Sequence, residues 1–220
     1  MNILALDCAV SRFGLAVKAG DKEITGVYDV GMRQSELLVP AIDELLSKAG
    51  IKASELDCTT MTIGPGSFTG LRLGISALKA IELAYDVPVY GVSSLEAYSY
   101  EYKNFGLPVL SCIDANKGRF YASIKNGSKI ILEDGDWETD RICESIKNFL
   151  KVILCGPDAK KLAEIIRQTN KDIEIAVPEV HSLYTDALIK ITENKEARQL
   201  KDYDGPVYLR ASEAEIKLNA

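Results

Sequence analysis

The chain reads Met61-Thr62-Ile63-Gly64-Pro65-Gly66-Ser67-Phe68-Thr69-Gly70-Leu71-Arg72-Leu73-Gly74 across its most informative stretch, and apolar residues continue to Ala84. An apolar run, a glycine-rich turn and a second long apolar stretch predict a strand, a tight turn and a helix. Ser67 or Thr69 is placed to cap that helix. Such a turn aims backbone N–H groups at whatever lies above it, so it has the form of an anion-binding loop.

Two known phosphate-binding patterns are close to this turn, and neither matches it. A Walker loop requires Lys and then Ser or Thr directly after its last glycine. Here Leu71 and Arg72 follow Gly70, and the spacing from Gly64 is one residue too long. The dinucleotide fingerprint requires its third glycine three residues after the second, whereas Gly70 lies four residues after Gly66. The pattern alone therefore favours a helix start over a phosphate site.

Size and composition set broad limits on the protein. The 220 residues, 47% of them hydrophobic, suffice for one large α/β domain or two small lobes. The net charge of -6 and the lack of a dense basic run indicate that contact with nucleic acid would need a partner's charge. Five widely spaced cysteines without a C-x-x-C motif indicate reduced thiols. With no signal-peptide pattern and no apolar run near about 18 residues, we expect a cytoplasmic protein without a membrane segment.

The pattern of apolar residues predicts strands and helices in both halves of the chain. In the first half it predicts strands within residues 3–17, 23–30, 59–63 and 87–92, and helices over 35–49 and after the glycine turn. The second half shows fewer elements: strands at 109–114 and 152–156, and helices over 158–168 and 182–193. Leu6-Asp7 followed by Arg12-Phe13 recurs as Ile113-Asp114 followed by Arg119-Phe120. The repeat predicts two related, closely packed lobes, residues 1–104 and a reduced lobe of residues 105–220.

Asp7 and Asp114 end equivalent strands in the two halves. In two-lobed nucleotide-binding folds, acids at such positions hold a metal–phosphate group. The alternative is a structural role, in which the carboxylate accepts a bond from the backbone two residues on. The β-branched Val10 is poorly suited to a phosphate turn after Asp7, so the structural role is favoured. His181 is the only histidine, which argues against metal sites and catalytic triads built on histidine.

The helix after Gly70 is more apolar than a helix lying on one sheet requires. Its polar residues Arg72, Ser76 and Lys79 form a single stripe, and apolar residues occupy well over half of the circumference. A helix on a sheet needs an apolar arc of somewhat more than about 100°. The excess must be covered either by the helix over 35–49 of the same lobe or by a partner, and the pattern does not decide between them.

The glycine-rich stretch resembles the signature of the TsaB family, also called YeaZ. The residues that carry this signature are Gly64, Pro65, Gly66, Ser67, Phe68, Thr69 and Gly70, followed by Leu71 and Arg72. Weaker matches lie along nearly the whole chain, at Ile3–Asp7, Ser35–Ile42, Ile113–Ala115 and Pro206–Arg210. The resemblance therefore covers both predicted lobes.

The resemblance implies a fold and a function. The fold would be the two-lobed α/β fold of the actin-like ATPase (ASKHA) superfamily, with ribonuclease-H-like lobes. The function would be that of a non-catalytic subunit, with at most trace ATPase activity, in the synthesis of N6-threonylcarbamoyladenosine in tRNA. Its expected partners are the transferase TsaD, the ATPase TsaE and, in isolation, a second copy of itself, with tRNA bound only through the complex. No cofactor is required, and the resemblance leaves open whether ATP or ADP lies at the partner interface.

The resemblance also implies where partners bind. The helices at about 36–49 and 70–84 would form one self-complementary surface for both the homodimer and the complex with TsaD. The residues predicted to contact a partner are Leu38, Ile42, Leu45, Arg72, Gly74, Ala77, Leu78 and Ile81. A specific contact of this kind buries on the order of 1,200–2,000 Å² in total.

Two residues depart from the family's pattern, and one rival hypothesis remains. Cys8 stands where Thr is common, and Gln34 stands where His is common. The first departure weakens a nucleotide role for the first lobe, and the second bears on the partner surface. The rival is an ATP-dependent enzyme that uses Asp7 and Asp114. A peptidase is not supported, since no nucleophile–base pair is recognisable.

Overall fold

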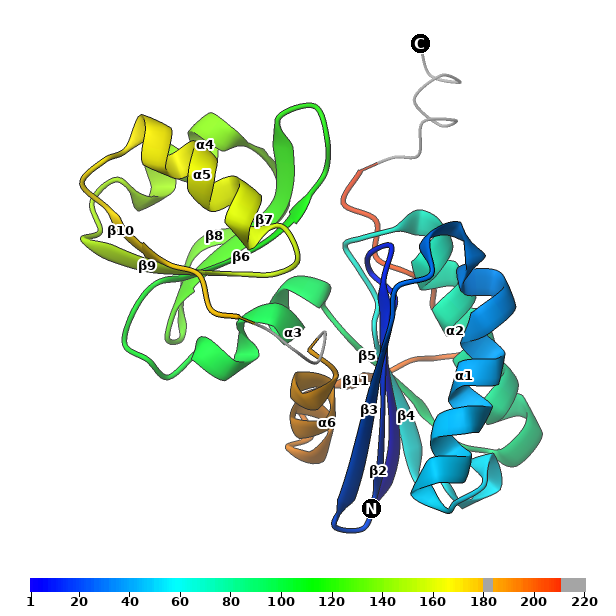
Figure 1. Ribbon diagram of the computed structural model, residues 1–220. Helices are drawn as coiled ribbons and strands as arrows, with labels where there is room; N and C mark the ends of the chain where they lie inside the picture. The colour runs from blue at the N-terminus through cyan, green and yellow to red at the C-terminus, as the bar shows by residue number, and fades with distance from the viewer. Residues whose placement is uncertain (180–183, 211–220) are drawn as a thin grey trace. The chain divides into compact units, whose positions relative to one another are not determined.

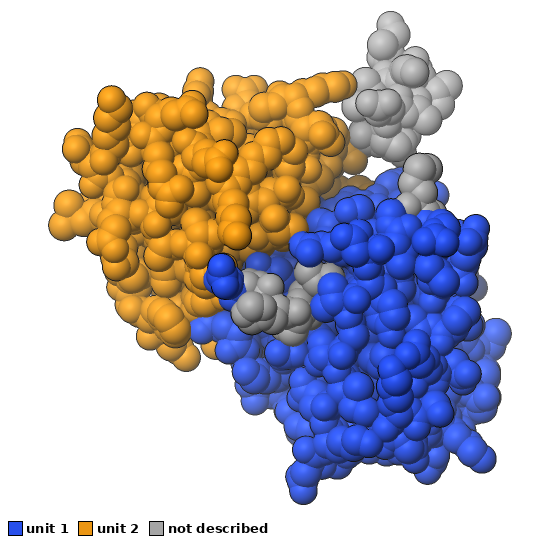
Figure 2. All heavy atoms as spheres, viewed as in Figure 1, with its two compact units in different colours: residues 1–101, 179–206 blue, residues 102–178, 207–220 orange. Residues whose placement is uncertain are grey.

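Two compact units make up the computed structural model, which describes residues 1–179 and 184–210 (Figure 1). Unit 1 comprises Met1–Glu101 and Glu179–Pro206, and unit 2 comprises Tyr102–Pro178 and the chain from Val207 on (Figure 2). Each unit contains one sheet, and each has its own hydrophobic core.

Unit 1 is built on a six-stranded sheet in the order β11-β5-β4-β1-β2-β3. Its strands are β1 (Asn2–Asp7), β2 (Phe13–Ala19), β3 (Lys22–Tyr28), β4 (Cys58–Thr62), β5 (Val89–Val92) and β11 (Arg198–Gln199). The central strand β1 pairs antiparallel with β2 and parallel with β4, so that Leu4 lies opposite both Val17 and Thr59. All of β1 after Asn2 is buried, as expected for a strand covered on both faces.

Helices cover both faces of this sheet. On one face, α1 (Gln34–Ala49) packs on β2 and β3, and α2 (Phe68–Tyr85) packs on β4 and β5 (Figure 1). On the other face, α6 (Thr185–Glu193) packs on β1, β2 and β4 and contacts α3 (Ser94–Ser99). Short 3₁₀ turns lie at Gly31–Arg33, Ala53–Glu55 and Tyr100–Tyr102.

Unit 2 is built on a five-stranded sheet in the order β10-β9-β6-β7-β8. Its strands are β6 (Val109–Asp114), β7 (Arg119–Asn126), β8 (Lys129–Glu138), β9 (Lys151–Cys155) and β10 (Glu174–Ala176). Two helices pack on it, α4 (Thr139–Ile146) on β8 and α5 (Ala159–Thr169) on β6 and β9. Ile142, Leu162 and Ile166 are fully buried in the core of this unit.

The two sheets have the same topology, which confirms the predicted duplication. If β6 to β10 correspond to β1 to β5, the strand orders are identical, and the central strand is antiparallel to the next strand in both units. α4 and α5 then occupy the places of α1 and α2 along the chain. The repeated Asp lies at the end of the central strand, and the repeated Phe lies in the strand after it.

The predicted boundary of the second lobe differs from the observed one. Residues 179–206, expected in the lobe of residues 105–220, fold with unit 1 instead. Leu188 and Ile191 of α6 are fully buried, and β11 extends the sheet of unit 1 by pairing with β5. The physical reason is that the sheet of unit 1 has a second apolar face, which a late helix of the chain covers. The expected start of this helix at Ser182 lies outside the described residues.

Two elements of unit 2 carry no clear sequence signal. β8 contains Asp134, Gly135 and Asp136, which are residue types depleted in strands. The Trp137 ring lies so close to Gly135 that a Cβ there would be 2.5 Å from ring atom Cε2. α4 is only 8 residues long, too short for its period to stand out.

Candidate partner interface

The glycine-rich turn closes tightly on the loop that follows β1. The backbone N–H of Ser67 donates to the carbonyl of Ala9 at 2.7 Å. A Cβ on Gly66 would lie 2.4 Å from the Ala9 carbonyl oxygen, and a Cβ on Gly70 would lie 2.3 Å from the Cys8 carbonyl oxygen. Only glycine permits this approach. Gly66 and Gly70 of the signature are therefore explained by the close contact of the turn and the start of α2 with the loop after β1.

The start of α2 follows from the same turn. The Ser67 hydroxyl accepts a hydrogen bond from the backbone N–H of Gly70 at 3.2 Å, so Ser67 is the cap and Thr69 lies within the helix. This bond satisfies one of the donors that a helix start leaves unpaired.

Asp7 is sealed inside unit 1. Its side chain is 1% exposed, and its Oδ1 accepts bonds from the Ala9 N–H at 3.0 Å and from the Thr62 hydroxyl at 2.8 Å. Burial raises the pKa of Asp7 to about 6, although hydrogen bonds from Ala9, Thr62 and Tyr98 act in the opposite direction. A carboxylate held in this way serves the local fold and is poorly placed to reach a metal–phosphate group.

Asp114 has a similar local role in unit 2. Its Oδ1 accepts the backbone N–H of Asn116 at 2.9 Å, two residues on, as Asp7 does from Ala9. Its Oδ2 pairs with the Lys161 ammonium group at 2.5 Å. The predicted bond to the backbone two residues on is therefore confirmed for both acids, which favours the structural role over the ATP-dependent enzyme.

The two departures from the family's pattern lie beside this turn. Cys8 is fully buried, its side chain faces Gly74 of α2, and burial raises the pKa of its thiol. The buried Gln34 side chain donates to the carbonyls of Val10 at 2.9 Å and Ser11 at 2.7 Å. The loop after β1 is thus tied to the first residue of α1 by Gln34 and to the start of α2 by Ser67.

Metal and membrane sites find no support in the part of the chain that the structure describes. Residues 1–179 and 184–210 contain no group of three or more His, Cys, Asp or Glu side chains able to hold a metal ion. His181 lies outside those residues. The five cysteines are free and buried. Among the described helices, none has the length and apolar character needed to cross a membrane.

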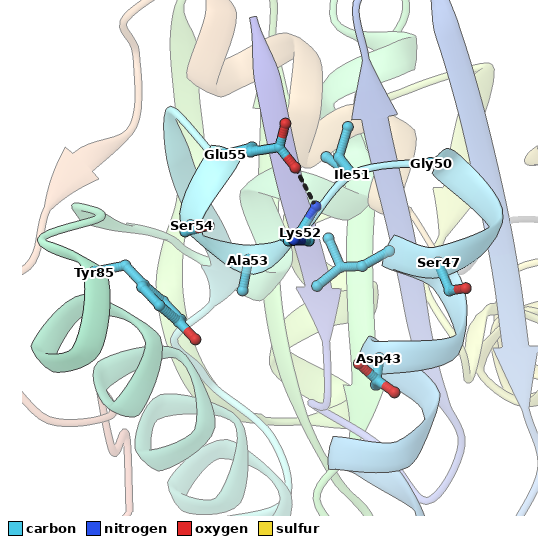
Figure 3. A pocket seen from close by; sticks show the side chains of 10 residues that line it. Asp43, Ser47, Gly50, Ile51, Lys52, Ala53, Ser54, Glu55 and Tyr85 are labelled. Atoms are coloured by element: carbon cyan, nitrogen blue, oxygen red, sulfur yellow. Dashed lines mark hydrogen bonds between the residues drawn. The ribbon is translucent and has the colours of Figure 1, made fainter.

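An apolar groove of about 260 Å³ runs between α1 and α2. It is lined by Val39, Ile42, Asp43, Leu46, Ala53, Ala77, Ala80, Ile81 and Tyr85. Beside it lies a more polar cleft of about 520 Å³ at the C-terminal ends of the two helices (Figure 3). Val39 is 59% exposed and Tyr85 52%, so the groove presents large apolar side chains to solvent. Grouped apolar side chains of this kind mark interaction surfaces.

The predicted contact residues divide into two groups. Ile42, Ala77 and Ile81 line the groove, and Arg72 is exposed with its guanidinium group 3.8 Å from the centre of the Phe68 ring. The other four were wrongly assigned to the partner surface, because they are buried and do not line the groove: Leu38, Leu45, Gly74 and Leu78.

The geometry of α2 explains this correction. Gly74 and Leu78 lie on the same side of the helix as Leu71, and that side faces the sheet. A Cβ on Gly74 would lie 2.9 Å from Met61 Cε and 3.1 Å from Leu6 Cδ2, so this glycine lets α2 approach its own sheet. The explanation by the helix over 35–49 holds in part, since α1 covers one flank of α2. The outer flank remains exposed, and its coverage by a partner stays a prediction.

Sequence reasoning missed several residues of the groove. Val39, Leu46, Ala53, Ala80 and Tyr85 line it without having been predicted. The spacing of Val39 and Leu46, and of Ala77, Ile81 and Tyr85, carries a helical signal for one face. This spacing identifies the groove only once the side of each helix that faces the sheet is known.

Comparisons with known proteins identify the family. The family model described as "TsaD: tRNA N6-adenosine threonylcarbamoyltransferase" matches residues 30–190. The protein of Bacillus subtilis (strain 168) named "tRNA threonylcarbamoyladenosine biosynthesis protein TsaB" is 27% identical over 226 residues, which cover 99% of this chain and 97% of that protein.

Two solved structures bear on the fold. A protein from Pseudomonas aeruginosa described as having similarity to peptidase YEAZ superposes with a TM-score of 0.76 at 20% identity, over 95% of this chain and 99% of that one. A Bacteroides thetaiotaomicron protein described as having an actin-like ATPase fold superposes with a TM-score of 0.51 at 10% identity, over 86% of this chain and 95% of that one. The predicted actin-like ATPase fold is therefore confirmed. With residues 30–190 matched by the transferase family model and TsaB covered almost from end to end, the chain belongs to that family and, within it, to the TsaB (YeaZ) family.

Proposed function

We propose that this protein is a non-catalytic subunit in the synthesis of N6-threonylcarbamoyladenosine in tRNA, and that it docks on a TsaD-type transferase through α1 and α2. The name of the Bacillus subtilis relative supports the pathway, and the match to the transferase family model supports a paralogous partner. The observation that carries the docking surface is the apolar groove between α1 and α2.

Unit 2 offers an internal comparison for this surface. α5 occupies the same topological position in unit 2 as α2 does in unit 1. The exposed positions of α5 carry polar side chains, namely Lys160, Lys161, Glu164, Arg167, Gln168 and Thr169. The exposed positions in the second half of α2 carry Ala80, Leu83, Ala84 and Tyr85. The shared topology does not require an apolar outer face, so its presence on α2 alone supports a docking role.

The non-catalytic assignment is supported by the state of the two candidate acids. Asp7 is sealed by Ala9 and Thr62, and Asp114 is paired with Lys161. We therefore assign the chain no cofactor of its own, and any ATP or ADP would lie where it meets its partner. The net charge of -6 supports tRNA contact only through the complex, since phosphate contacts dominate RNA affinity. In this proposal the complex forms in the cytoplasm and includes TsaE, and the isolated chain forms a homodimer.

Substitution of Ala77 tests the proposal. Ala77 is half-buried in the groove rather than facing the sheet, so Ala77→Glu should remain folded. Docking would bury an unpaired charge there and should weaken association with the transferase at least about tenfold. Reconstituted transfer of the threonylcarbamoyl group to tRNA should need both proteins and should fail with this variant.

A matched control adds the same charge to the other unit. Gln168→Glu places a carboxylate on the exposed face of α5 and should leave both docking and transfer unchanged. Thermal melts establish that each variant is folded, and analytical ultracentrifugation measures both assemblies. Transfer by this chain alone, insensitive to added transferase, would contradict the non-catalytic role. A folded Ala77→Glu protein that still docks would place the interface elsewhere.

A further inference from the structure

The groove and the cleft adjoin to form one recess with two chemically different halves. The apolar groove and the polar cleft share Asp43, Leu46, Ala53 and Tyr85. Figure 3 shows the cleft, with Asp43 on α1 and Tyr85 at the end of α2 on either side of it. A partner that fills the recess therefore meets an apolar surface and, directly beside it, the carboxylate of Asp43.

Asp43 differs from the other acids near it. Within α1, Glu44 pairs with Lys48 at 2.5 Å, and within α2, Glu82 pairs with Lys79 at 2.6 Å. Asp43 has no ion pair within residues 1–179 and 184–210, and its side chain is exposed. It is the charged side chain that lines both halves of the recess.

The surroundings of Asp43 add to its negative potential. The cleft lies at the last turn of α1, where Ser47 and the cap residue Gly50 line it, and at the last residue of α2, Tyr85. The carbonyl ends of helices carry partial negative charge. The other charged residues of the cleft are Glu55, whose carboxylate accepts the backbone N–H of Lys52 at 2.8 Å, and Lys52 itself.

We infer that the recess takes a helix of the transferase that seats an apolar side chain in the groove and an arginine or lysine against Asp43. This inference rests on the proposed function and adds the chemistry by which the partner is selected. Docking removes Asp43 from water, and a buried carboxylate without a cation is costly. A partner lacking the cation is therefore rejected, whereas a partner that supplies it gains a charge-assisted contact. Asp43 is thus a specificity-determining residue of the interface.

Charge substitution at Asp43 tests the inference. Isothermal titration calorimetry measures the Kd between the full chain and the TsaD-type transferase at low and high salt. Asp43→Asn should raise the Kd about tenfold, and Asp43→Lys should raise it further, and both should reduce the salt dependence of the Kd. Glu36→Gln is the control, because Glu36 is exposed in the first turn of α1 and lines neither half of the recess.

Each outcome decides something. If one exchange of Lys or Arg for Glu on the transferase restores binding to Asp43→Lys, it identifies the paired cation and supports the inference. An unchanged Kd for Asp43→Lys overturns the inference while leaving the proposed function standing. A wild-type chain that does not bind the transferase overturns the proposed function and the inference with it. If the variants weaken only self-association, the occupant is a second copy of this chain and the inference fails.

Discussion

Asp7 shows how an acid at the end of a central strand can serve the local fold. An acid at the end of the central strand would need open access to act on a phosphate group. Here the loop after β1 returns over the carboxylate, and Thr62 of the neighbouring strand donates to the same oxygen. The bonds that hold the carboxylate hold the loop too, and the loop in turn contacts Ser67 and Gln34. Asp7 thus helps to fix the starts of α1 and α2.

The pKa of Asp7 predicts a pH dependence of stability. The pKa is about 6 in the folded protein against an ordinary value of 3.8, so the folded state binds the proton more tightly. The stability contributed by protonated Asp7 is present below about pH 4 and is lost as the pH rises through about 6. This difference in pKa corresponds to about 3 kcal/mol in the free energy of unfolding. Urea unfolding of wild type and Asp7→Asn between pH 4 and 8 measures it.

Asp7→Asn isolates this effect because its amide stays neutral while its oxygen can still accept from Ala9 and Thr62. The free energy of unfolding of the variant should increase relative to that of wild type as the pH rises from 4 to 7. Every other titrating group is common to the two proteins, so parallel curves would show that Asp7 does not titrate in this range.

Two sides of α2 have different roles, one packing on the sheet and the other lining the groove. Leu71, Gly74 and Leu78 pack on the sheet, and Ala77 and Ile81 line the groove. Its first turn is set by Gly70, where a Cβ would meet the Cys8 carbonyl. The position of the turn therefore fixes how deeply the helix sits on the sheet and which residues reach the groove.

Gly70→Ala should destabilise unit 1 by about 1–3 kcal/mol, because a rigid backbone oxygen 2.3 Å from the new Cβ forces α2 away from the loop. The gain in helix propensity, about 1 kcal/mol, offsets only part of that cost. Gly205→Ala is the control, since no atom lies within 4 Å of a Cβ there. Equal urea midpoints for the two variants would mean that the contact between turn and loop yields at little cost.

The sequence predicts these elements better than it predicts their orientation. The helices over 35–49 and after Gly70 were recognised from their apolar period, and the repeat around Asp7 and Asp114 indicated the duplication. The assignment of Gly74 and Leu78 to a partner was wrong, since a helix that is apolar over most of its circumference does not reveal which side meets its own sheet. Leu38 and Leu45 were wrongly assigned because the apolar side of α1 packs on β2 and β3. The location of α6 was missed for a related reason: its apolar face suits either sheet, and only tertiary packing selects one.

The protein as a whole is a duplication whose halves have diverged in surface chemistry. Both units keep the same strand order, and both use an Asp at the end of the central strand to cap its own turn. They differ on the outer faces of their helices, which are apolar in the second half of α2 and polar on α5. The proposed function assigns docking to unit 1 alone, so the two units should respond differently to the same partner.

Hydrogen exchange with and without the transferase measures this difference within one sample. Binding to the folded state adds stability where the contact forms. The amides of α1 and α2, residues 34–49 and 68–85, should therefore exchange more slowly in the complex, most of all beside the groove around Ile42 and Ala77. The amides of α4 and α5, residues 139–146 and 159–169, are the internal control and should be unchanged.

Protection of α4 and α5 without protection of α1 and α2 would assign docking to unit 2, whereas uniform protection would indicate global stabilisation in place of a local interface. We expect protection of α1 and α2 alone, because α5 has the topological position of α2 but no apolar outer face to bury.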